Sequence, residues 1–147
     1  MKKVKLITSS ETYPLRLAIL WSHLKNEEDC SIDVDELEGT FHVGAYKDEE
    51  LVAVGTFLIE SNKQLKEKKQ YRLRAMATST KVRGEGFGKQ IIDFAVEELK
   101  QRKMEILWCD ARKIALGFYE KMDFTIIGDY YDVPKIGPHK LMYKRIS

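Results

Sequence analysis

The sequence has few of the features that mark secreted, disulfide-bonded or membrane-spanning proteins. It has only two cysteines, Cys30 and Cys109, which lie far apart and in no spacing typical of a metal or redox site. Its longest uncharged apolar stretches fall far short of the roughly 20 residues that a membrane helix needs. The charged N-terminus is not followed by the apolar run of a signal peptide. We therefore expect a cytoplasmic protein with reduced thiols and no membrane association.

The chain also lacks internal repeats, and no linker rich in proline, glycine or serine divides it. At roughly 100–200 residues per domain, residues 1–147 are expected to form a single domain. The formal charge of +2 is too small to indicate nucleic-acid binding, and the lysine-rich segment 63–69 has little aromatic interleaving. The three histidines form no metal spacing, and the Asp33-x-Asp35 pair fails the pattern of a calcium loop. We expect neither a metal nor a nucleic-acid partner.

What the sequence does contain is a mixture of strand-like and helix-like segments. Alternating or continuous apolar residues predict strands at residues 3–7, 41–46, 51–60, 71–78, 106–109, 124–131 and 141–146. The acidic stretch 27–38 is expected to be a loop with a short helical piece, and residues 134–138 a turn. The mixture predicts an α+β, or mixed α/β, fold with a largely antiparallel sheet.

Three segments have apolar residues at helical spacing. Residues 9–12 supply capping side chains for a first helix, with Pro14 in its first turn and an apolar stripe that reaches Leu24. A long amphipathic helix is expected from Phe87 to Arg102. A further amphipathic helix is expected over residues 111–122. Its apolar stripe comprises Ile114, Ala115, Phe118 and Met122.

The most informative segment is a glycine-rich turn between the strand at 71–78 and the long helix. It reads Arg83-Gly84-Glu85-Gly86-Phe87-Gly88-Lys89. The unpaired N–H groups and the positive dipole end of a helix N-terminus attract phosphate, and glycine lets phosphate approach the backbone closely. The dinucleotide-binding fingerprint fails because position 89 is lysine. A P-loop fails because Arg83 and Gln90 stand where glycine and Ser/Thr are required.

Two blocks of the sequence resemble the GNAT N-acetyltransferase superfamily. The pattern Arg83-x-x-Gly86-x-Gly88 resembles its acyl-CoA-binding motif, and residues 114–124 resemble its A-x-x-F-Y-x-x-x-x-F block. Together with the intervening strand, these blocks cover residues 71–124. Residues 13–16, 108–112 and 136–139 look like those of an uncharacterised bacterial subgroup. The resemblance implies a mostly antiparallel sheet of six to seven strands, flanked by helices and splayed between the fourth and fifth strands.

The same resemblance implies a binding site for acetyl-CoA. The diphosphate would lie on the backbone amides of residues 84–89, and the pantetheine arm along residues 76–78. The implied cofactor-binding residues are Met76, Ala77, Thr78, Arg83, Gly84, Glu85, Gly86, Phe87, Gly88 and Lys89. A backbone N–H near Met76 or Ala77 would stabilise the oxyanion of the tetrahedral intermediate, an effect worth about 3 kcal/mol. Dimers are common in the family, so the resemblance is compatible with a homodimer, and the sequence leaves the oligomeric state open.

Tyr119 matches the residue that protonates the departing CoA thiolate in the family. A tyrosine, with a pKa of about 10, is a weaker acid than a thiol at about 8.5, so complete transfer is uphill by roughly 2 kcal/mol. A hydrogen bond to the sulfur is therefore an alternative role. The general base stays open among Asp110, His139, Glu60 and water. Asp110 could instead cap the helix expected from residue 111.

The expected function is acyl-CoA-dependent transfer of an acetyl group directly to a primary amine of a small molecule or peptide. Acidic residues 27–38 lie where the superfamily often forms the acceptor entrance, which suits a cationic amine. The alternative is a non-catalytic CoA-binding or regulatory protein. Two features keep that alternative open: Arg112 stands where many members have asparagine, and the sequence shows no obvious general base. A second departure is Asp123, in place of the usual glycine before Phe124, which concerns the end of the helix.

Overall fold

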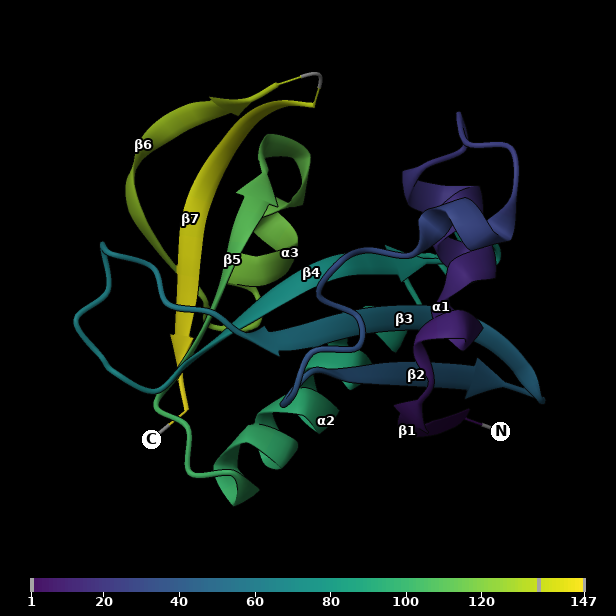
Figure 1. The fold of residues 1–147 in the computed structure, drawn as a ribbon, viewed down its shortest axis with the longest axis horizontal. Helices are drawn as coiled ribbons and strands as arrows, with labels where there is room; N and C mark the ends of the chain where they lie inside the picture. The colour runs from purple at the N-terminus through teal and green to yellow at the C-terminus, as the bar shows by residue number, and fades with distance from the viewer. Residues whose placement is uncertain (1, 135, 147) are drawn as a thin grey trace.

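A seven-stranded sheet forms the centre of the structure (Figure 1). The computed structural model describes residues 2–134 and 136–146. The strands are β1 (Lys2–Ile7), β2 (Phe41–Lys47), β3 (Glu50–Ile59), β4 (Gln70–Thr78), β5 (Ile106–Arg112), β6 (Thr125–Val133) and β7 (Gly137–Arg145). Their order in the sheet is β1-β2-β3-β4-β5-β7-β6. Only the β4–β5 pair is parallel among the described strands, so the mostly antiparallel, mixed sheet is confirmed.

The helical segments cover both faces of this sheet. They are α1 (Ser9–Leu15), the π-helical turn η1 (Arg16–Leu20), the 3₁₀ turns η2 (Glu27–Cys30), η3 (Thr80–Val82) and η4 (Lys113–Ala115), and the helices α2 (Phe87–Gln101) and α3 (Leu116–Glu120). In β3, Gly55 faces Ile91 of α2, whereas the neighbouring Thr56 accepts a hydrogen bond from Arg16 of η1. Successive residues of a strand point to opposite faces, so α2 and η1 lie on opposite sides.

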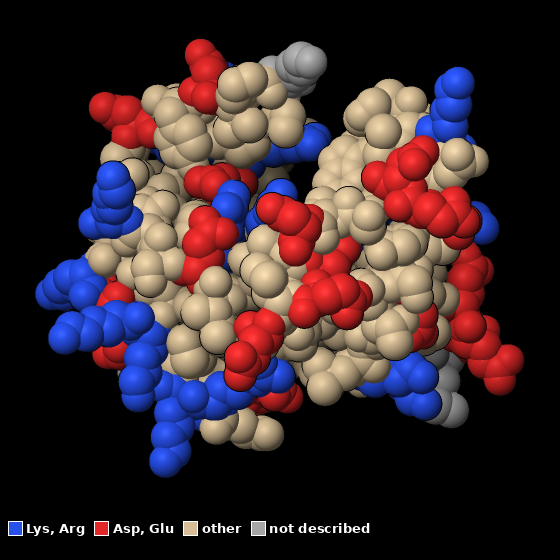
Figure 2. Space-filling view, in the orientation of Figure 1, with Lys and Arg blue, Asp and Glu red and all other residues tan. Residues whose placement is uncertain are grey.

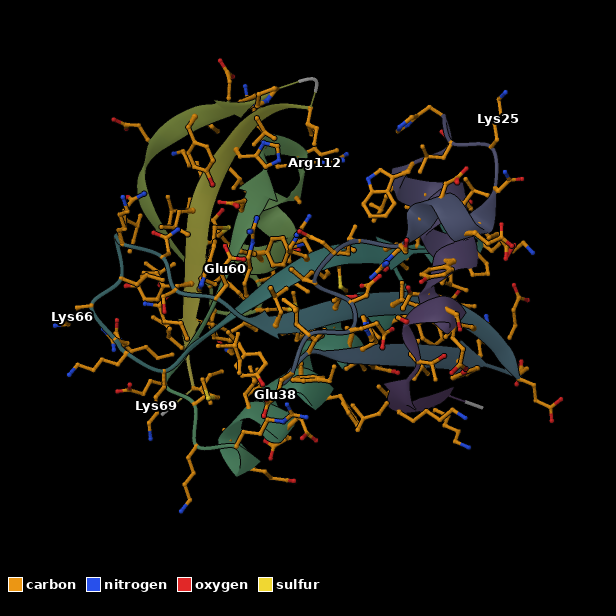
Figure 3. All side chains as sticks on the ribbon, viewed as in Figure 1. Lys25, Glu38, Glu60, Lys66, Lys69 and Arg112 are labelled. Atoms are coloured by element: carbon orange, nitrogen blue, oxygen red, sulfur yellow. The ribbon has the colours of Figure 1, made fainter. Side chains whose placement is uncertain are left out.

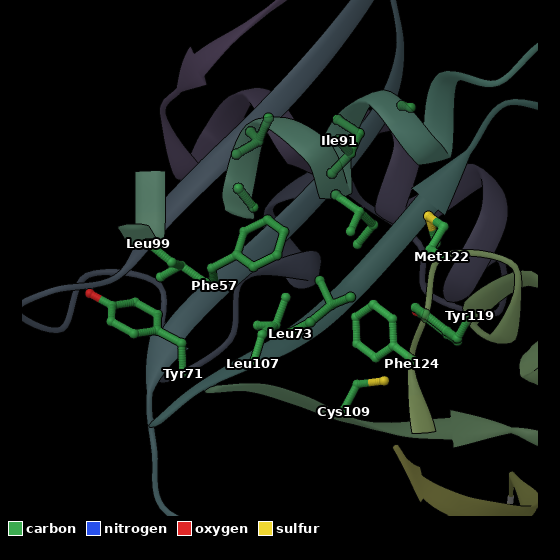
Figure 4. Close-up of a cluster of buried hydrophobic side chains, with 14 of the residues drawn as sticks. Phe57, Tyr71, Leu73, Ile91, Leu99, Leu107, Cys109, Tyr119, Met122 and Phe124 are labelled. Atoms are coloured by element: carbon green, nitrogen blue, oxygen red, sulfur yellow. The ribbon is translucent and has the colours of Figure 1, made fainter. Parts of the chain in front are cut away.

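The main core lies between the sheet and α2 (Figure 4). The apolar stripe predicted for this helix is buried, with Ile91, Ala95 and Leu99 on its inner face. They pack in one cluster with strand residues such as Phe57 and Leu73. Each large apolar side chain buried in this way stabilises the fold by about 1.5–3 kcal/mol. This packing fixes α2, and with it the turn at its N-terminus, against β2–β4.

The first helix differs from the sequence prediction. Its N-cap is Thr8, whose N–H donates to the Glu11 carboxylate at 2.9 Å, and Pro14 is the sixth helical residue, outside the first turn. Proline has no N–H to give to the turn before it. The chain continues in a widened turn, in which the Trp21 N–H donates to the Arg16 carbonyl at 2.9 Å. Helical structure then ends at Leu20, so the predicted stripe to Leu24 is wrong.

The helix predicted over residues 111–122 is also wrong in its extent. Strand β5 continues to Arg112, because its pairing with β7 extends to the Arg112–His139 pair. Helical structure is limited to η4 and the short α3. Ile114, assigned to the buried stripe, is 90% exposed, and Phe118 is exposed as well. The buried residues of segment 111–122 are Ala111, Tyr119 and Met122.

Candidate functional site

Strands β4 and β5 separate soon after they meet. Their parallel pairing covers only three register pairs, Gln70–Arg72 with Ile106–Trp108. Beyond that point β4 follows β3 and β5 follows β7, so the predicted splay between the fourth and fifth strands is confirmed. A cavity of about 350 Å³ occupies the opening, and we call it the cleft. Figure 2 shows it as a hollow between the two halves of the molecule.

The wall of the cleft formed by β4 contains a β-bulge. Val54 pairs with Ala77 and Thr56 with Arg74, so Gly55 faces both Ala75 and Met76. Ala75 has a φ of +53°, a left-handed conformation that is uncommon for a residue with a side chain. A bulge takes one residue out of the ladder of hydrogen bonds and turns the strand. The backbone near Met76, where the resemblance implied an oxyanion donor, is therefore irregular and borders the cleft.

The glycine turn, residues 83–89, leads from β4 and η3 into α2. Gly86 is the N-cap of α2, with φ +85°, and the Gln90 N–H donates to its carbonyl at 3.1 Å. No atom lies within 4 Å of the position that a Cβ would take at Gly84 or Gly86. The first turn of α2 holds no acidic residue. Open space beside backbone N–H groups at a helix N-terminus fits an anionic group such as a diphosphate.

The third glycine of the turn has a different local role. Gly88 is buried, and a Cβ there would lie 2.8 Å from Cζ of Phe118. Its lack of a side chain therefore lets α3 pack directly against the first turn of α2. The same Cβ position is 3.4 Å from the Cε of Met76, which lines the cleft. The glycine turn and the cleft thus adjoin at Met76.

The charged side chains of the turn are partly engaged with neighbours. Glu85 accepts a hydrogen bond from Lys47 at 2.8 Å, and Lys89 pairs with Asp93 at 2.6 Å. Arg83 is exposed. The implied cofactor-binding residues of β4 and the glycine turn are therefore brought together by the fold, and the geometry of the turn fits the group that the sequence led us to expect. Their role as ligands stays a prediction.

Tyr119 of α3 lines the cleft although its ring belongs to the core. Its ring lies between those of Phe118 and Phe124, with centroid distances of 5.0 and 5.2 Å. Burial, with a smaller effect of the Cys109 thiol, raises the pKa of Tyr119 well above its ordinary value of 10. The hydroxyl is therefore protonated at neutral pH and can donate a hydrogen bond. Burial likewise raises the pKa of Cys109, which leaves this thiol a poor nucleophile.

Asp110 does not cap a helix, because it lies inside β5 where the chain is extended by pairing with β7. Its Oδ2 accepts a hydrogen bond from Arg72 Nη2 at 2.7 Å, and its Oδ1 accepts one from the Tyr131 hydroxyl. Burial, then this hydrogen bond, raises the pKa of Tyr131, so the phenol remains a donor. Both oxygens of Asp110 are thus engaged, which makes this carboxylate a poor candidate for the general base.

Glu60 directly follows β3, at the strand end that the sequence predicted, whereas the position of His139 was not predicted. Glu60 accepts a hydrogen bond from Arg72 Nη1 at 3.0 Å and does not line the cleft (Figure 3). His139 lies in β7 rather than beside a turn, and it is buried and lines the cleft. Position 135 of the predicted turn 134–138 lies outside the described residues. His139 Nδ1 is 2.9 Å from the Gly137 carbonyl, which can only accept, so Nδ1 carries hydrogen and Nε2 holds the lone pair of the neutral ring.

Sequence reasoning missed two arginines of the cleft, Arg72 and Arg74. Both lie on β4 and line the cavity. The signal was their spacing of two residues in an otherwise apolar strand, which places both side chains on one face. Within the described part of the chain, no group of three or more His, Cys, Asp or Glu side chains could hold a metal ion. None of the described helices is both long and apolar enough to cross a membrane.

Comparison with known proteins identifies the family. The model of the Acetyltransferase (GNAT) family matches residues 7–124. A Bacillus subtilis (strain 168) protein named "Uncharacterized N-acetyltransferase YitI" is 36% identical over 146 residues, which cover 99% of this chain and 97% of the relative.

Solved structures share the fold at low sequence identity. The ribosomal-protein-S18-alanine N-acetyltransferase from Escherichia coli matches with a TM-score of 0.75 and 15% identity, covering 100% of this chain and 95% of that one. An aminoglycoside 6'-N-acetyltransferase complexed with coenzyme A matches with a TM-score of 0.79 and 12% identity, covering 99% and 97%. The family match and the 36% identical relative each span most of the chain, and the chain belongs to the acetyltransferase (GNAT) family.

Proposed function

We propose that this protein transfers an acetyl group from acetyl-CoA directly to a primary amine of a small molecule or peptide. The observation that carries the proposal is the junction of the glycine turn with the cleft at Met76. This junction offers an anion-binding helix N-terminus beside a cavity that holds a buried tyrosine and a histidine. A structural neighbour with the same fold is described as a complex with coenzyme A, which supports the choice of donor.

In this proposal the glycine turn binds the diphosphate of the donor. The backbone N–H groups at the start of α2 hold the phosphates, and the open space beside Gly84 and Gly86 admits them. The irregular backbone at Ala75 and Met76 directs an N–H group toward the acetyl carbonyl, where it stabilises the developing oxyanion. The substrate supplies the thioester, and these residues bind and orient it.

The attacking amine must lose a proton before it can react. With a lysine-like pKa of about 10.4, only about one amine molecule in a thousand is neutral at pH 7. His139 is the candidate base that has an available lone pair, at Nε2, while Asp110 and Glu60 are both engaged with Arg72. Tyr119 donates a hydrogen bond to the leaving sulfur. The ammonium form of the acceptor first gives one proton to His139. As the N–C bond then forms and the C–S bond breaks, the nitrogen loses a second proton and the sulfur gains one, so one proton is released to solvent overall.

A non-catalytic CoA-binding protein would need the glycine turn but not the groups in the cleft. To separate these functions, we would measure acetyl-CoA binding by calorimetry and thiol release across a panel of amines, amino acids and peptides. The parent protein should bind acetyl-CoA and release thiol with at least one amine. Binding without thiol release on every acceptor would support the non-catalytic function instead.

The Gly86→Asp variant tests the location of the diphosphate. The new carboxylate would repel the phosphates and fill the open space, so acetyl-CoA binding should fall by at least about a hundredfold, equivalent to about 2.8 kcal/mol. Gly128→Asp is the matched control, since Gly128 has φ +77° and is exposed on β6. Both variants place a side chain at a positive φ, +85° and +77°. Unchanged affinity in Gly86→Asp, or an equal loss in Gly128→Asp, would contradict the proposed site.

A further inference from the structure

The charged side chains that line the cleft are mainly basic. Arg72, Arg74 and Arg112 line it, and Asp110 is the one carboxylate among its described lining residues. Arg72 is neutralised by Asp110 and Glu60, at 2.7 and 3.0 Å. Figure 2 shows basic atoms within the hollow and acidic side chains on the surface around it. Two arginines therefore remain available in the cleft.

Arg74 lies on the β4 wall, and none of the described residues forms an ion pair with it. The charged groups that act on it are Arg72, Asp33, Glu60 and Arg16. Of these, Glu60 is bound to Arg72, and Arg16 is bound to Asp35. Burial, followed by the charge of Arg72, lowers the pKa of Arg74 below its ordinary value. The charged guanidinium is thus held in a site that lacks a bound counter-charge, and an anionic ligand would supply one.

Arg112 provides a second cation from the opposite wall. It ends β5, is exposed, and lies toward the open end of the cleft (Figure 3). No ion pair joins Arg112 to any other part of the described chain. No residue of the acidic stretch 27–38, which was expected at the acceptor entrance, lines the cleft, and of this stretch only the charge of Asp33 acts on Arg74, from outside the cavity. Another carboxylate of this stretch, Asp35, is buried against Arg16 instead.

We propose that the acceptor amine carries a carboxylate, which binds Arg74 and is assisted by Arg112. A guanidinium matches a carboxylate in geometry through two parallel hydrogen bonds, so the pair gives both affinity and orientation. The acceptor class is then a small amino-carboxylate, such as an amino acid, rather than a polycation. This assignment rests on the proposed acyl transfer and names the substrate class of that same site.

The test uses pairs of acceptors that differ in one charge. Thiol release from acetyl-CoA is measured with each amino acid and with its amide, for example L-leucine and L-leucinamide, and with the polyamine spermidine. In the parent protein, kcat/KM should be higher for the amino acids than for their amides or for spermidine. In Arg74→Gln it should fall by about 10- to 100-fold for the carboxylates, since hydrogen bonds between charged groups are lost. In the same variant, kcat/KM for the amides and the affinity for acetyl-CoA should each change by less than about twofold.

Lys66→Gln is the matched control, because it removes one exposed cation from a loop that does not line the cleft (Figure 3). Lys66→Gln should leave kcat/KM unchanged for both the amino acids and the amides. Preference for amides or spermidine, or an equal loss on both series in Arg74→Gln, would overturn the assignment while leaving acyl transfer intact. If acetyl-CoA binds but no acceptor is turned over, acyl transfer itself fails, and the assignment fails with it. The amide series also reports whether Arg74→Gln is correctly folded.

Discussion

At the scale of single residues, Tyr119 is expected to act on the leaving sulfur and His139 on the attacking amine. Tyr119→Phe removes only the hydroxyl, so the hydrogen bond to the leaving sulfur is lost while the buried ring remains. We expect kcat to fall about tenfold at every pH, with acetyl-CoA affinity unchanged. Steady-state kinetics from pH 6 to 9, with calorimetry for the donor, provide the measurement. Equal turnover in variant and parent would remove Tyr119 from the mechanism.

His139→Gln should show a different pH dependence. Loss of a general base lowers turnover by about 100-fold or more near neutral pH. The deficit should shrink as the pH rises, since a growing fraction of the amine is then neutral in solution and needs no base. The pH profile therefore distinguishes a base from a merely structural residue, which would give a constant deficit. A deficit that stays constant from pH 6 to 9 would exclude His139 as the base.

Two single positions show what the sequence could and could not reveal about the backbone. Asp123 has φ +67° in the turn that ends α3, where its N–H donates to the Glu120 carbonyl at 3.0 Å, so the replacement of the usual glycine concerns the end of the helix. That position was predictable because its conformation is set by a local helix terminus. Ala75 has φ +53° for a different reason: a bulge in the pairing of β3 with β4. Nothing near Ala75 in the sequence signals a bulge that depends on a partner strand.

At the scale of elements, a buried ion pair joins η1 to the acidic segment and the sheet. Arg16 donates to both oxygens of Asp35 at 2.8 Å, to Thr56 of β3 at 2.8 Å and to the Cys30 carbonyl at 2.9 Å. His42 of β2 extends this network to Thr56 at 2.8 Å. The acidic segment 27–38, expected to be a loop with a short helical piece, does contain the turn η2 and is anchored by a residue from another element.

Asp35→Asn should destabilise the protein strongly, because it leaves Arg16 buried without a counter-charge. We expect the free energy of unfolding to fall by about 3–5 kcal/mol, measured by urea denaturation at pH 7. Asp33→Asn is the control: it changes an exposed residue of the same segment and should cost less than about 0.5 kcal/mol. Equal effects of the two variants would show that the ion pair does not stabilise the fold.

The same pair predicts a pH dependence. Burial alone would raise the pKa of Asp35, but hydrogen bonds from Arg16 and Ile32, with the Arg16 charge, bring it below its ordinary value. The unfolded value is about 3.9, so the stabilisation is fully present above that pH and is lost as the pH falls through the folded pKa. The free energy of unfolding should therefore fall below about pH 4 in the parent protein, and this contribution to the fall should be missing in Asp35→Asn.

Local sequence patterns predicted the positions of helices and strands well. They did not predict features that depend on pairing between strands far apart in the sequence. The extent of α2 followed from apolar spacing and the glycine turn, both of which lie within one stretch of sequence. The error at residues 111–122 arose because β7, about thirty residues away in sequence, holds β5 extended as far as Arg112. The same pairing moved Asp110 from a helix cap into a strand and placed His139 in the cleft. Family blocks located Tyr119 and the glycine turn, whereas Arg74 became apparent only in three dimensions.

At the scale of the whole molecule, binding of the donor should stabilise the folded protein against unfolding. A ligand that binds only the folded state at about 100 times its Kd adds about 2.7 kcal/mol. For a chain of this size, Tm should rise by about 5–10 °C, measured by differential scanning fluorimetry. Pantetheine, which lacks the diphosphate, should give a much smaller shift at equal concentration. A full shift with pantetheine, or in Gly86→Asp, would show that the glycine turn contributes nothing to binding.

The short contact between β4 and β5 has a consequence for how this architecture can change over time. Arg72 and Arg74 face away from the apolar cluster that β4, β5 and α2 build on the other side of the sheet. Under the proposed function, substitutions at these two positions would alter which molecule is accepted without repacking the interior that keeps the protein folded. Under the same proposal, selection could exchange one acceptor for another at little cost in stability, while the glycine turn proposed to bind the donor stays unchanged.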